Sequence, residues 1–282
     1  MNSKNKTYTL NLKGHLTQVD RPLVMGILNI TPDSFYAGSR WSDEQEILAR
    51  AEKMLSEGAD IIDIGGQSTR PGAERISADE EISRVIPAIK SVLKQFPEAI
   101  ISVDTFYSEV AKQAVDNGAA IINDISAGRL DDKMFETVAK LNVPYVLMHM
   151  KGEPQTMHLH PHYKNVVSDV VKFFSGKINE LRLMGVNDLI LDPGFGFGKT
   201  QEHNIELMQH LDALTIFDIP LLVGISRKKM VQRMVETDAA GALNGTTALN
   251  TVALMKGAQI LRVHDVKEAV EAVKVARAMS KH

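Results

Sequence analysis

Eight short, almost wholly apolar runs recur along this chain, and each is followed by a longer amphipathic stretch. The runs are rich in Ile, Leu and Val and do not alternate with polar residues, which is typical of strands buried on both faces of a parallel sheet. We expect these strands at residues 23–30, 60–64, 100–103, 120–123, 144–148, 189–191, 220–224 and 259–263. Strands and helices alternating in this number predict an α/β fold, a closed (β/α)₈ or TIM barrel.

The stretches between the strands have helical periodicity and end at glycines. The first stretch has one apolar face, formed by Ile47, Leu48, Ala51, Met54 and Leu55. The tetrapeptides EGAD, NGAA and KGAQ, at 57–60, 117–120 and 256–259, each place a glycine between a helix and the next strand. We interpret them as one type of helix-to-strand turn used three times, and not as evidence of gene duplication.

An open, doubly wound sheet is the alternative that the same alternation allows. In its dinucleotide-binding version the first strand is followed by Gly-x-Gly-x-x-Gly, which this chain lacks after residue 30. No linker or low-complexity segment divides the sequence, so we treat residues 1–282 as a single barrel domain. The first twenty residues, in which Tyr8, Leu10 and Leu12 alternate with polar residues, predict a short extended or hairpin segment before the barrel.

Composition narrows the function classes. The chain has no cysteine, which excludes disulfides, thiolate zinc sites and cysteine nucleophiles. The net charge of -3 gives no support for a nucleic-acid partner. No apolar run approaches the roughly 20 residues of a membrane helix, and the first residues lack the apolar core of a signal peptide. We therefore expect a cytoplasmic protein without a membrane or nucleic-acid partner.

Polar residues stand at the end of every expected strand. They are Asn29, Asp63, Asp104, Asn123 with Asp124, His149, Asp192, Ser226 with Lys228, and Arg262 with His264. A single Asp or Asn after a strand is more often a turn former or helix cap than a functional group. Eight strands ending in this way are harder to explain by capping. Because barrel enzymes place their active sites at the carboxyl ends of the strands, we expect the site there.

These residues fall into two chemical groups. Asp104, Asn123 and Asp192 can donate and accept in pairs, which suits the edge of a planar nitrogen heterocycle. Arg70, Arg262, His264 and Lys228 can hold an anion through charge-assisted hydrogen bonds, and Asn29 offers an oxygen ligand that suits Mg²⁺. The simpler interpretation remains open: Arg262 and His264 would pair with barrel acids, and Lys228 would be a solvated lysine at a helix start.

Two further segments resemble known motifs only superficially. DPGFGFGK (192–199) is similar to a phosphate loop, but Pro193 stands where that motif needs its first glycine. HLHPH (158–162) is histidine-rich, but it has no acidic residues at ligand spacing, so we interpret it as a surface loop.

Taken in order, the segments at the strand ends resemble one enzyme family. They are MGILNITPDSF (25–35), DIGGQSTRPGA (63–73), SVDT (102–105), IIND (121–124), LMHM (147–150), LDPGFGFGK (191–199), GISRK (224–228) and RVHD (262–265). Each is weak alone, but eight in register, one per strand, resemble the dihydropteroate synthases, the folate-pathway enzymes that sulfonamides block. The resemblance runs from about Pro22 to Ala278, nearly the whole chain.

The resemblance implies a reaction and a set of site residues. In that family 6-hydroxymethyl-7,8-dihydropterin diphosphate reacts with 4-aminobenzoate to give 7,8-dihydropteroate and pyrophosphate. The positions matching the family's pterin site are Asp104, Asn123, Met148, Asp192, Phe197 and Lys228. Those matching its diphosphate site are Asn29, Thr69, Arg70, Arg262 and His264, with Mg²⁺ at Asn29. The expected 4-aminobenzoate contacts are Phe35, Thr69, Pro71 and Ser226.

Charge explains which of these residues we expect to be catalytic. Loss of pyrophosphate leaves positive charge on the pterin methylene, which the carboxylate of Asp104 would stabilise. Arg70, Arg262, His264 and Mg²⁺ would stabilise the leaving group, with Lys228 beside the pterin. The aniline nitrogen is already nucleophilic, so no strong general base is needed.

Two loops depart from the family pattern. The first usually reads TPDSFSDGG and here reads TPDSFYAGS, so that Tyr36, Ala37 and Ser39 replace Ser, Asp and Gly. The missing aspartate removes a group that would help to organise the metal, a role that Asp33 would cover in part. The second usually reads GGEST, and here Gln67 replaces the glutamate. Sulfonamide sensitivity depends on these loops, so the sequence does not predict it.

Two other functions share parts of this pattern. The folate-binding barrel of corrinoid-dependent methyltransferases would share the pterin contacts, but it should lack Arg262, His264 and the SRK segment (226–228). A non-catalytic pterin-binding subunit is supported only by the altered first loop.

The resemblance also implies a homodimer. An apolar stripe on the last helices fits such an interface and fits packing on the barrel equally well; it comprises Leu249, Val252, Ala253, Val266, Ala269, Val270 and Val273.

Overall fold

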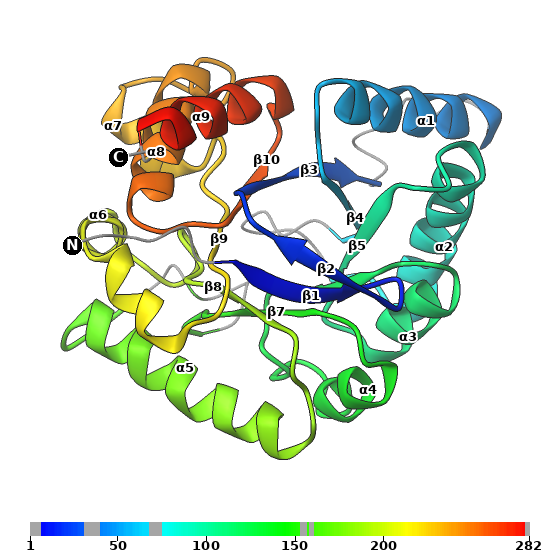
Figure 1. Ribbon diagram of the computed structural model, residues 1–282, viewed down its shortest axis with the longest axis horizontal. Helices are drawn as coiled ribbons and strands as arrows, with labels where there is room; N and C mark the ends of the chain where they lie inside the picture. The colour runs from blue at the N-terminus through cyan, green and yellow to red at the C-terminus, as the bar shows by residue number, and fades with distance from the viewer. Residues whose placement is uncertain (1–6, 31–39, 68–74, 153–156, 158–160, 280–282) are drawn as a thin grey trace.

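The computed structural model describes residues 7–30, 40–67, 75–152, 157 and 161–279, and its centre is a barrel of eight parallel strands (Figure 1). The strands are β3 (Leu23–Asn29), β4 (Ile61–Gly65), β5 (Ile100–Asp104), β6 (Ile121–Asp124), β7 (Tyr145–Met148), β8 (Leu189–Asp192), β9 (Leu222–Val223) and β10 (Ile260–Val263). They are paired in the order β8-β7-β6-β5-β4-β3-β10-β9. A parallel bridge between Leu191 and Leu221 brings the two ends of this sheet together. The predicted TIM barrel is therefore confirmed.

Seven of the eight expected strands agree with the structure to within one residue at each end. The exception is β9, which is limited to Leu222–Val223 where 220–224 was expected. Pro220 has no backbone N–H to donate to a ladder, and its carbonyl accepts the bond from Leu191 N at 2.9 Å. The closing seam of the barrel thus depends on few backbone hydrogen bonds.

Helices cover the outside of the barrel (Figure 1). They are α1 (Arg40–Ser56), α2 (Ala78–Gln95), α3 (Ser108–Asp116), α4 (Met134–Leu141), α5 (Val166–Leu183), α6 (Gln201–Gln209), the 3₁₀ helix η2 (Leu211–Phe217), α7 (Lys229–Met234), α8 (Leu243–Met255) and α9 (Val266–Met279). In α1 the expected apolar face is buried at Ile47, Ala51 and Met54. None of the helices in the described ranges is long and apolar enough to cross a membrane.

The three recurring glycine turns have the same geometry. Gly58, Gly118 and Gly257 have φ values of +99°, +102° and +100°. In each turn the residue after the glycine donates its N–H to a carbonyl five positions earlier, as Ala59 does to Met54 at 2.9 Å. This is the Schellman end of a helix, in which the left-handed residue is usually glycine. The turns deliver the chain into β4, β6 and β10.

A hairpin closes the amino-terminal end of the barrel. Its strands β1 (Tyr8–Leu12) and β2 (His15–Val19) pair antiparallel and lie across the barrel in Figure 1. Tyr8, Leu10, Leu12 and Val19 pack against the innermost apolar layer, formed by Met25, Ile61, Ala120, Ile121, Val146, Ile190, Leu222 and Ile260. The predicted lead-in segment is therefore a plug, and it leaves the opposite end of the barrel for the polar strand ends.

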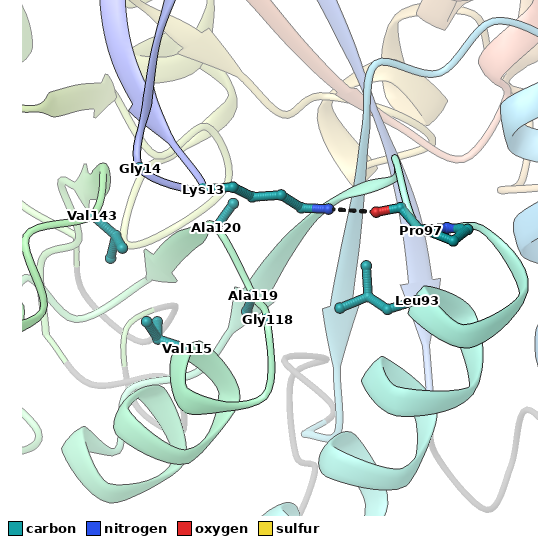
Figure 2. A pocket seen from close by; sticks show the side chains of 9 residues that line it. All are labelled: Lys13, Gly14, Leu93, Pro97, Val115, Gly118, Ala119, Ala120 and Val143. Carbon is teal, nitrogen blue, oxygen red and sulfur yellow. Dashed lines mark hydrogen bonds between the residues drawn. The ribbon is translucent and has the colours of Figure 1, made fainter.

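A hollow of about 450 Å³ lies beside this plug. Lys13 and Gly14 of the hairpin turn line it together with Leu93 and Pro97, and Lys13 Nζ donates to Pro97 O at 2.8 Å (Figure 2). Its remaining lining residues precede β6 and β7 at their amino-terminal ends. The hollow is therefore at the end of the barrel that lacks the strand-end polar residues.

Most of the apolar stripe on the last two helices packs on the barrel. Ala253, Val266, Ala269 and Val273 are buried in the main core, whereas Val252 is 40% exposed. Of the two interpretations of this stripe, barrel packing accounts for most of it.

Candidate active site

The polar residues of the site lie one step above the apolar layer that the hairpin seals. Along a strand every second side chain faces the same way, so a residue two positions after a layer member also faces the barrel interior. Asn123 follows Ile121 at this spacing, Asp192 follows Ile190, and Arg262 follows Ile260. Asp63 follows Ile61 in the same way. The strands thus place carboxylate, amide and guanidinium groups in a single interior layer at their carboxyl ends.

Arg262 joins two of the carboxylates in this layer. Its Nε donates to Asp63 Oδ2 at 2.6 Å, and its Nη2 donates to Asp104 Oδ2 at 2.5 Å. The three side chains come from β10, β4 and β5, and Asp63 is fully buried. The pairing of Arg262 with barrel acids, which the sequence left open, is therefore present in the structure.

This cluster carries an excess of negative charge, because two carboxylates share one guanidinium. Burial raises the pKa of Asp104 to about 7; the charge of Arg262 opposes that shift, and the charge of Asp63 adds to it. The second oxygen of Asp63, Oδ1, has no hydrogen-bond partner among the described residues. The arrangement is one that a cationic or N–H-rich ligand would stabilise.

Asn123 and Asp192 complete the interior layer of polar side chains, which also includes Asp63, Asp104 and Arg262 and is called the polar floor below. Asn123 Nδ2 donates to Asp63 Oδ2 at 3.1 Å, and only 3% of Asn123 is exposed. Asp192 Oδ1 accepts from Gly194 N at 2.7 Å, and burial raises the pKa of this carboxyl. Its second oxygen approaches the space above Gly224. The polar floor therefore contains both acceptors and an amide, as expected for a heterocycle site.

Asp124 has a different role from its neighbour. It accepts from Ser126 N at 2.6 Å, from Gly128 N at 2.8 Å and from the hydroxyl of Tyr145 at 2.7 Å. Because adjacent residues of a strand face opposite sides, Asn123 points inward while Asp124 holds the turn after β6. The turn-forming interpretation is correct for this residue.

Apolar side chains lie beside the polar floor, and Met148 and Phe197 among them are called the apolar wall below. Met148 and Phe197 belong to one small buried cluster with Phe106, Ile125, Met150 and Met157. Lys228 Nζ lies 4.6 Å from the centroid of the Phe197 ring and donates to Phe195 O at 2.7 Å. Burial lowers the pKa of Lys228 to about 8, against the charges of Asp192 and Asp104. Lys228 is therefore half-buried in the site and is not a solvated lysine at the start of α7.

Ser226 and His264 lie together at the rim. Ser226 Oγ accepts from His264 N at 3.2 Å and lies 3.0 Å from His264 Nδ1. His264 reaches solvent, yet desolvation of its ring and the charge of Arg262 lower its pKa to about 4. The imidazole is therefore neutral near pH 7.

Arg227, next to Ser226 in the chain, forms an ion pair with Asp265, next to His264. It has a φ of +56°, in the left-handed region that residues other than glycine seldom adopt. The guanidinium binds both oxygens of Asp265, at 2.9 Å and 2.7 Å. This bidentate pair joins the SRK segment to the segment that follows β10.

Two residues of the strand ends have structural partners that the sequence did not predict. The side chain of Lys199 is buried and donates to the carbonyls of Gly194 and Phe197, at 2.8 Å and 3.1 Å. His149 Nδ1 lies 3.0 Å from the same ammonium. Lys199 is thus engaged inside the DPGFGFGK segment, which does not present it as a phosphate loop would.

Four of the predicted site residues, Phe35, Thr69, Arg70 and Pro71, lie outside the described residues. Gln67, which stands where the family has glutamate, accepts from Ile76 N at 3.2 Å across the base of the second loop. A glutamate oxygen would accept the same bond, so the substitution keeps this contact.

The described residues contain no group of three or more His, Asp or Glu side chains that could hold a metal ion by themselves. Asn29 ends β3 next to Gly65 of β4, with its side chain half-exposed. Mg²⁺ in phosphate-transfer sites commonly uses one or two protein oxygens and completes its shell with substrate phosphates and water. A single neutral oxygen at Asn29 fits that kind of site and does not fit a metal cage made only of protein groups.

Sequence reasoning placed Asp63 among the strand-end residues but assigned it no role in the site. The signal was available, because Asp63 has the same two-residue spacing from the apolar layer as Asn123, Asp192 and Arg262. Glu81 of α2 was not singled out either; it is fully buried and accepts from Thr105 Oγ1 at 2.9 Å. Burial raises the pKa of Glu81 to about 7. No motif marks Glu81, because its environment arises only when α2 packs on β4 and meets Thr105, the residue after β5.

A barrel whose interior ends in carboxylates, an amide and an apolar wall has the features of a heterocycle-binding enzyme, and family comparison agrees. Residues 25–264 match the family of pterin binding enzymes. Dihydropteroate synthase of Escherichia coli strain K12 is 42% identical over 268 residues, which covers 94% of each chain. The chain belongs to the pterin binding enzymes and, within them, to the dihydropteroate synthases.

Solved structures agree with this assignment. The Yersinia pestis dihydropteroate synthase, solved with a sulfonamide drug, superposes with a TM-score of 0.91 at 42% identity, covering 98% of this chain and 100% of that one. The Xanthomonas albilineans enzyme, solved with 7,8-dihydropteroate, gives a TM-score of 0.87 at 37% identity with the same coverage. The resemblance that the strand-end motifs indicated is thereby confirmed.

Proposed function

We propose that this chain condenses 6-hydroxymethyl-7,8-dihydropterin diphosphate with 4-aminobenzoate, giving 7,8-dihydropteroate and pyrophosphate. The observation that carries the proposal is the buried cluster of Asp63, Asp104, Asn123 and Arg262 at the carboxyl ends of the strands. It offers acceptors and a donor to a planar heterocycle, within a scaffold shared with the dihydropteroate synthases.

The pterin would lie on the polar floor against the apolar wall. Asp104, Asn123 and Asp192 would bind the N–H and carbonyl groups of its edge, since each reaches the interior layer from a different strand. Met148 and Phe197 would pack on the ring face. Lys228, held above Phe197, would donate to an acceptor of the ring.

The reaction breaks the bond between the pterin methylene carbon and the diphosphate oxygen and forms a bond from that carbon to the aniline nitrogen. The nitrogen then loses a proton, and the bond electrons leave with pyrophosphate. Positive charge on the methylene would be stabilised by the surplus negative charge that Asp63 and Asp104 hold against Arg262. Positioning and charge stabilisation therefore dominate over acid–base chemistry.

The leaving group would be bound at the rim. Its proposed ligands in the described part of the chain are Arg262, His264 and Asn29. Thr69 and Arg70 are further proposed ligands. Neutral His264 would act as a hydrogen-bond donor rather than as a cation. Mg²⁺, held by the Asn29 oxygen and the diphosphate, would neutralise charge on the leaving oxygens.

The 4-aminobenzoate would enter over the first two loops. Ser226, fixed by His264 at 3.0 Å, is its proposed contact in the described part of the chain. Phe35, Thr69 and Pro71 are the other proposed contacts.

We further propose a cytoplasmic homodimer. Support comes from exposed apolar side chains at helical spacing on the two last helices: Val252 and Met255 on α8, and Val275 and Met279 on α9. Covering such side chains is a common result of self-association.

Pyrophosphate release tests the catalytic proposal. The protein is incubated with Mg²⁺ and the pterin diphosphate, with and without 4-aminobenzoate. Release that requires 4-aminobenzoate and yields dihydropteroate supports the synthase. Pterin binding without release would indicate a non-catalytic subunit, and methyl transfer from a folate to a corrinoid would indicate the methyltransferase class. Either of these results would overturn the proposal.

A further inference from the structure

We propose that Lys199 is a positioning residue for pterin binding: its buried ammonium fixes the loop after β8 so that Phe197 faces the pocket beside Lys228. The inference rests on the proposed function, because it names a residue that holds the pterin wall of that same site. The ammonium of Lys199 binds backbone carbonyls, and the residue acts through the loop.

The ammonium group of Lys199 contacts several polar atoms of the protein. Lys199 Nζ lies 2.8 Å from Gly194 O, 3.1 Å from Phe197 O, 3.0 Å from His149 Nδ1 and 3.3 Å from His149 O. Only 6% of the residue is exposed, and none of the ion pairs found among the described residues includes it. Burying an ammonium is costly, and here desolvation lowers the pKa of Lys199 to about 7, against the charge of Asp192. The N–H groups are therefore used on the loop carbonyls of Gly194 and Phe197 and on His149.

Those carbonyls belong to a loop with little backbone hydrogen bonding of its own. A bond of 3.1 Å from Phe197 N to Gly194 O spans it. The remaining contacts come from side chains: Asn204 Oδ1 accepts from Gly196 N at 2.8 Å, and the Tyr163 hydroxyl donates to Gly198 O at 2.9 Å. A loop held in this way keeps its shape only while the side chains that bind it are present.

The loop also packs closely against the segment that follows β7. A Cβ atom on Gly194 would lie 1.9 Å from His149 O, and one on Gly198 would lie 2.2 Å from Lys151 O. The two backbones therefore pack directly against each other, and Lys199 lies at this seam, contacting both sides. Removing its donors would leave the carbonyls facing each other without a bridging cation.

The fixed loop connects Lys199 to the pocket. Lys199 binds Phe197 O, while Lys228 binds Phe195 O at 2.7 Å and lies over the Phe197 ring at 4.6 Å. The two lysines therefore bind the same short segment. A shift of the loop would therefore move the aromatic wall and the Lys228 ammonium together, and both belong to the proposed pterin site and not to the 4-aminobenzoate site.

Lys199→Met tests the inference, because it keeps an unbranched apolar stem and removes the donors. Tyr163→Phe is the matched control, since it removes one hydrogen bond to the same loop at Gly198, the residue after Phe197, and leaves the bond to Phe197 O in place. Binding of 6-hydroxymethylpterin is measured by titration calorimetry, KM is measured for each substrate, and thermal unfolding is followed. We expect Lys199→Met to weaken pterin binding at least tenfold and to leave KM for 4-aminobenzoate within twofold. Tyr163→Phe should lower thermal stability and keep pterin binding within twofold.

Pterin binding within twofold of the wild type in folded Lys199→Met would overturn the inference. Equal weakening by Tyr163→Phe would also overturn it, because general loop destabilisation would then suffice. If the methionine variant does not fold, Lys199→Leu, which also removes the donors, is judged by the same criteria. Wild-type pyrophosphate release, measured in parallel, separates failure of the proposed function from failure of the role of Lys199.

Discussion

Removal of the guanidinium of Arg262 should destabilise the folded protein, because Asp63 and Asp104 would then repel each other without a neutralising cation. In Arg262→Met the stem is kept, but Asp63 and Asp104 lose donors at 2.6 Å and 2.5 Å. Breaking a buried ion pair by removing one partner costs about 3–5 kcal/mol. At roughly 2–4 °C per kcal/mol for a chain of this size, the midpoint of thermal unfolding should fall by about 6–20 °C.

The loss of folding stability in Arg262→Met should grow as the pH rises. The pKa of Asp104 is about 7 in the folded protein, against about 3.9 for an unfolded aspartate. The folded state thus binds protons between these values that the unfolded state has released, and its stability falls as pH rises through that window. Without Arg262, whose charge lowers it, the pKa of Asp104 rises further. The penalty for Arg262→Met should therefore be larger at pH 8 than at pH 5.

Urea unfolding of four proteins provides the assay: wild type, Arg262→Met, Asp63→Asn and the double variant. The double variant should recover part of the loss, with a coupling energy of about 0.5–3 kcal/mol between the two sites. A penalty below about 1 kcal/mol that does not change between pH 5 and pH 8 would refute the reasoning, because the cluster would then not be electrostatically coupled.

Four further changes have defined outcomes. Asp104→Asn should lower kcat about 10²–10³-fold while the protein stays folded, as for loss of one electrostatic stabiliser of a transition state; full turnover in the kinetic assay would remove this residue from catalysis. Arg262→Ala should raise KM for the pterin diphosphate more than KM for 4-aminobenzoate, and the reverse order would place the diphosphate elsewhere. Asn29→Ala should raise the Mg²⁺ concentration that gives half-maximal rate, and an unchanged Mg²⁺ titration would argue against Asn29 as a ligand. Leu10→Ala in the plug, where the side chain is 1% exposed, should cost about 2–5 kcal/mol in urea unfolding and leave both KM values unchanged.

The layers of the barrel could be predicted from local sequence because strand periodicity is a local property. Apolar runs located seven strands to within one residue, and the two-residue spacing places Asn123, Asp192 and Arg262 in one interior layer. The shortening of β9 follows from Pro220, which is also visible in the sequence. These features require no knowledge of how distant strands meet.

The pairings inside the layer could not be predicted in the same way. Arg262 reaches past β3 to Asp63 on β4 and Asp104 on β5, and these partners are 199 and 158 residues away in sequence. Periodicity gives the direction of a side chain, but the partner depends on barrel curvature and side-chain length. Lys199 is a similar case, because its motif is similar to a phosphate loop while its ammonium turns inward to carbonyls.

A crystal structure of the protein with 6-hydroxymethylpterin bound tests the central claim most directly. The ring should lie on the interior layer, with its polar edge hydrogen-bonded to Asp104, Asn123 and Asp192 and one face against Met148 and Phe197. A ring bound outside the barrel interior, or bound inside without contact to these three polar side chains, would contradict the assignment of the strand ends as a pterin site.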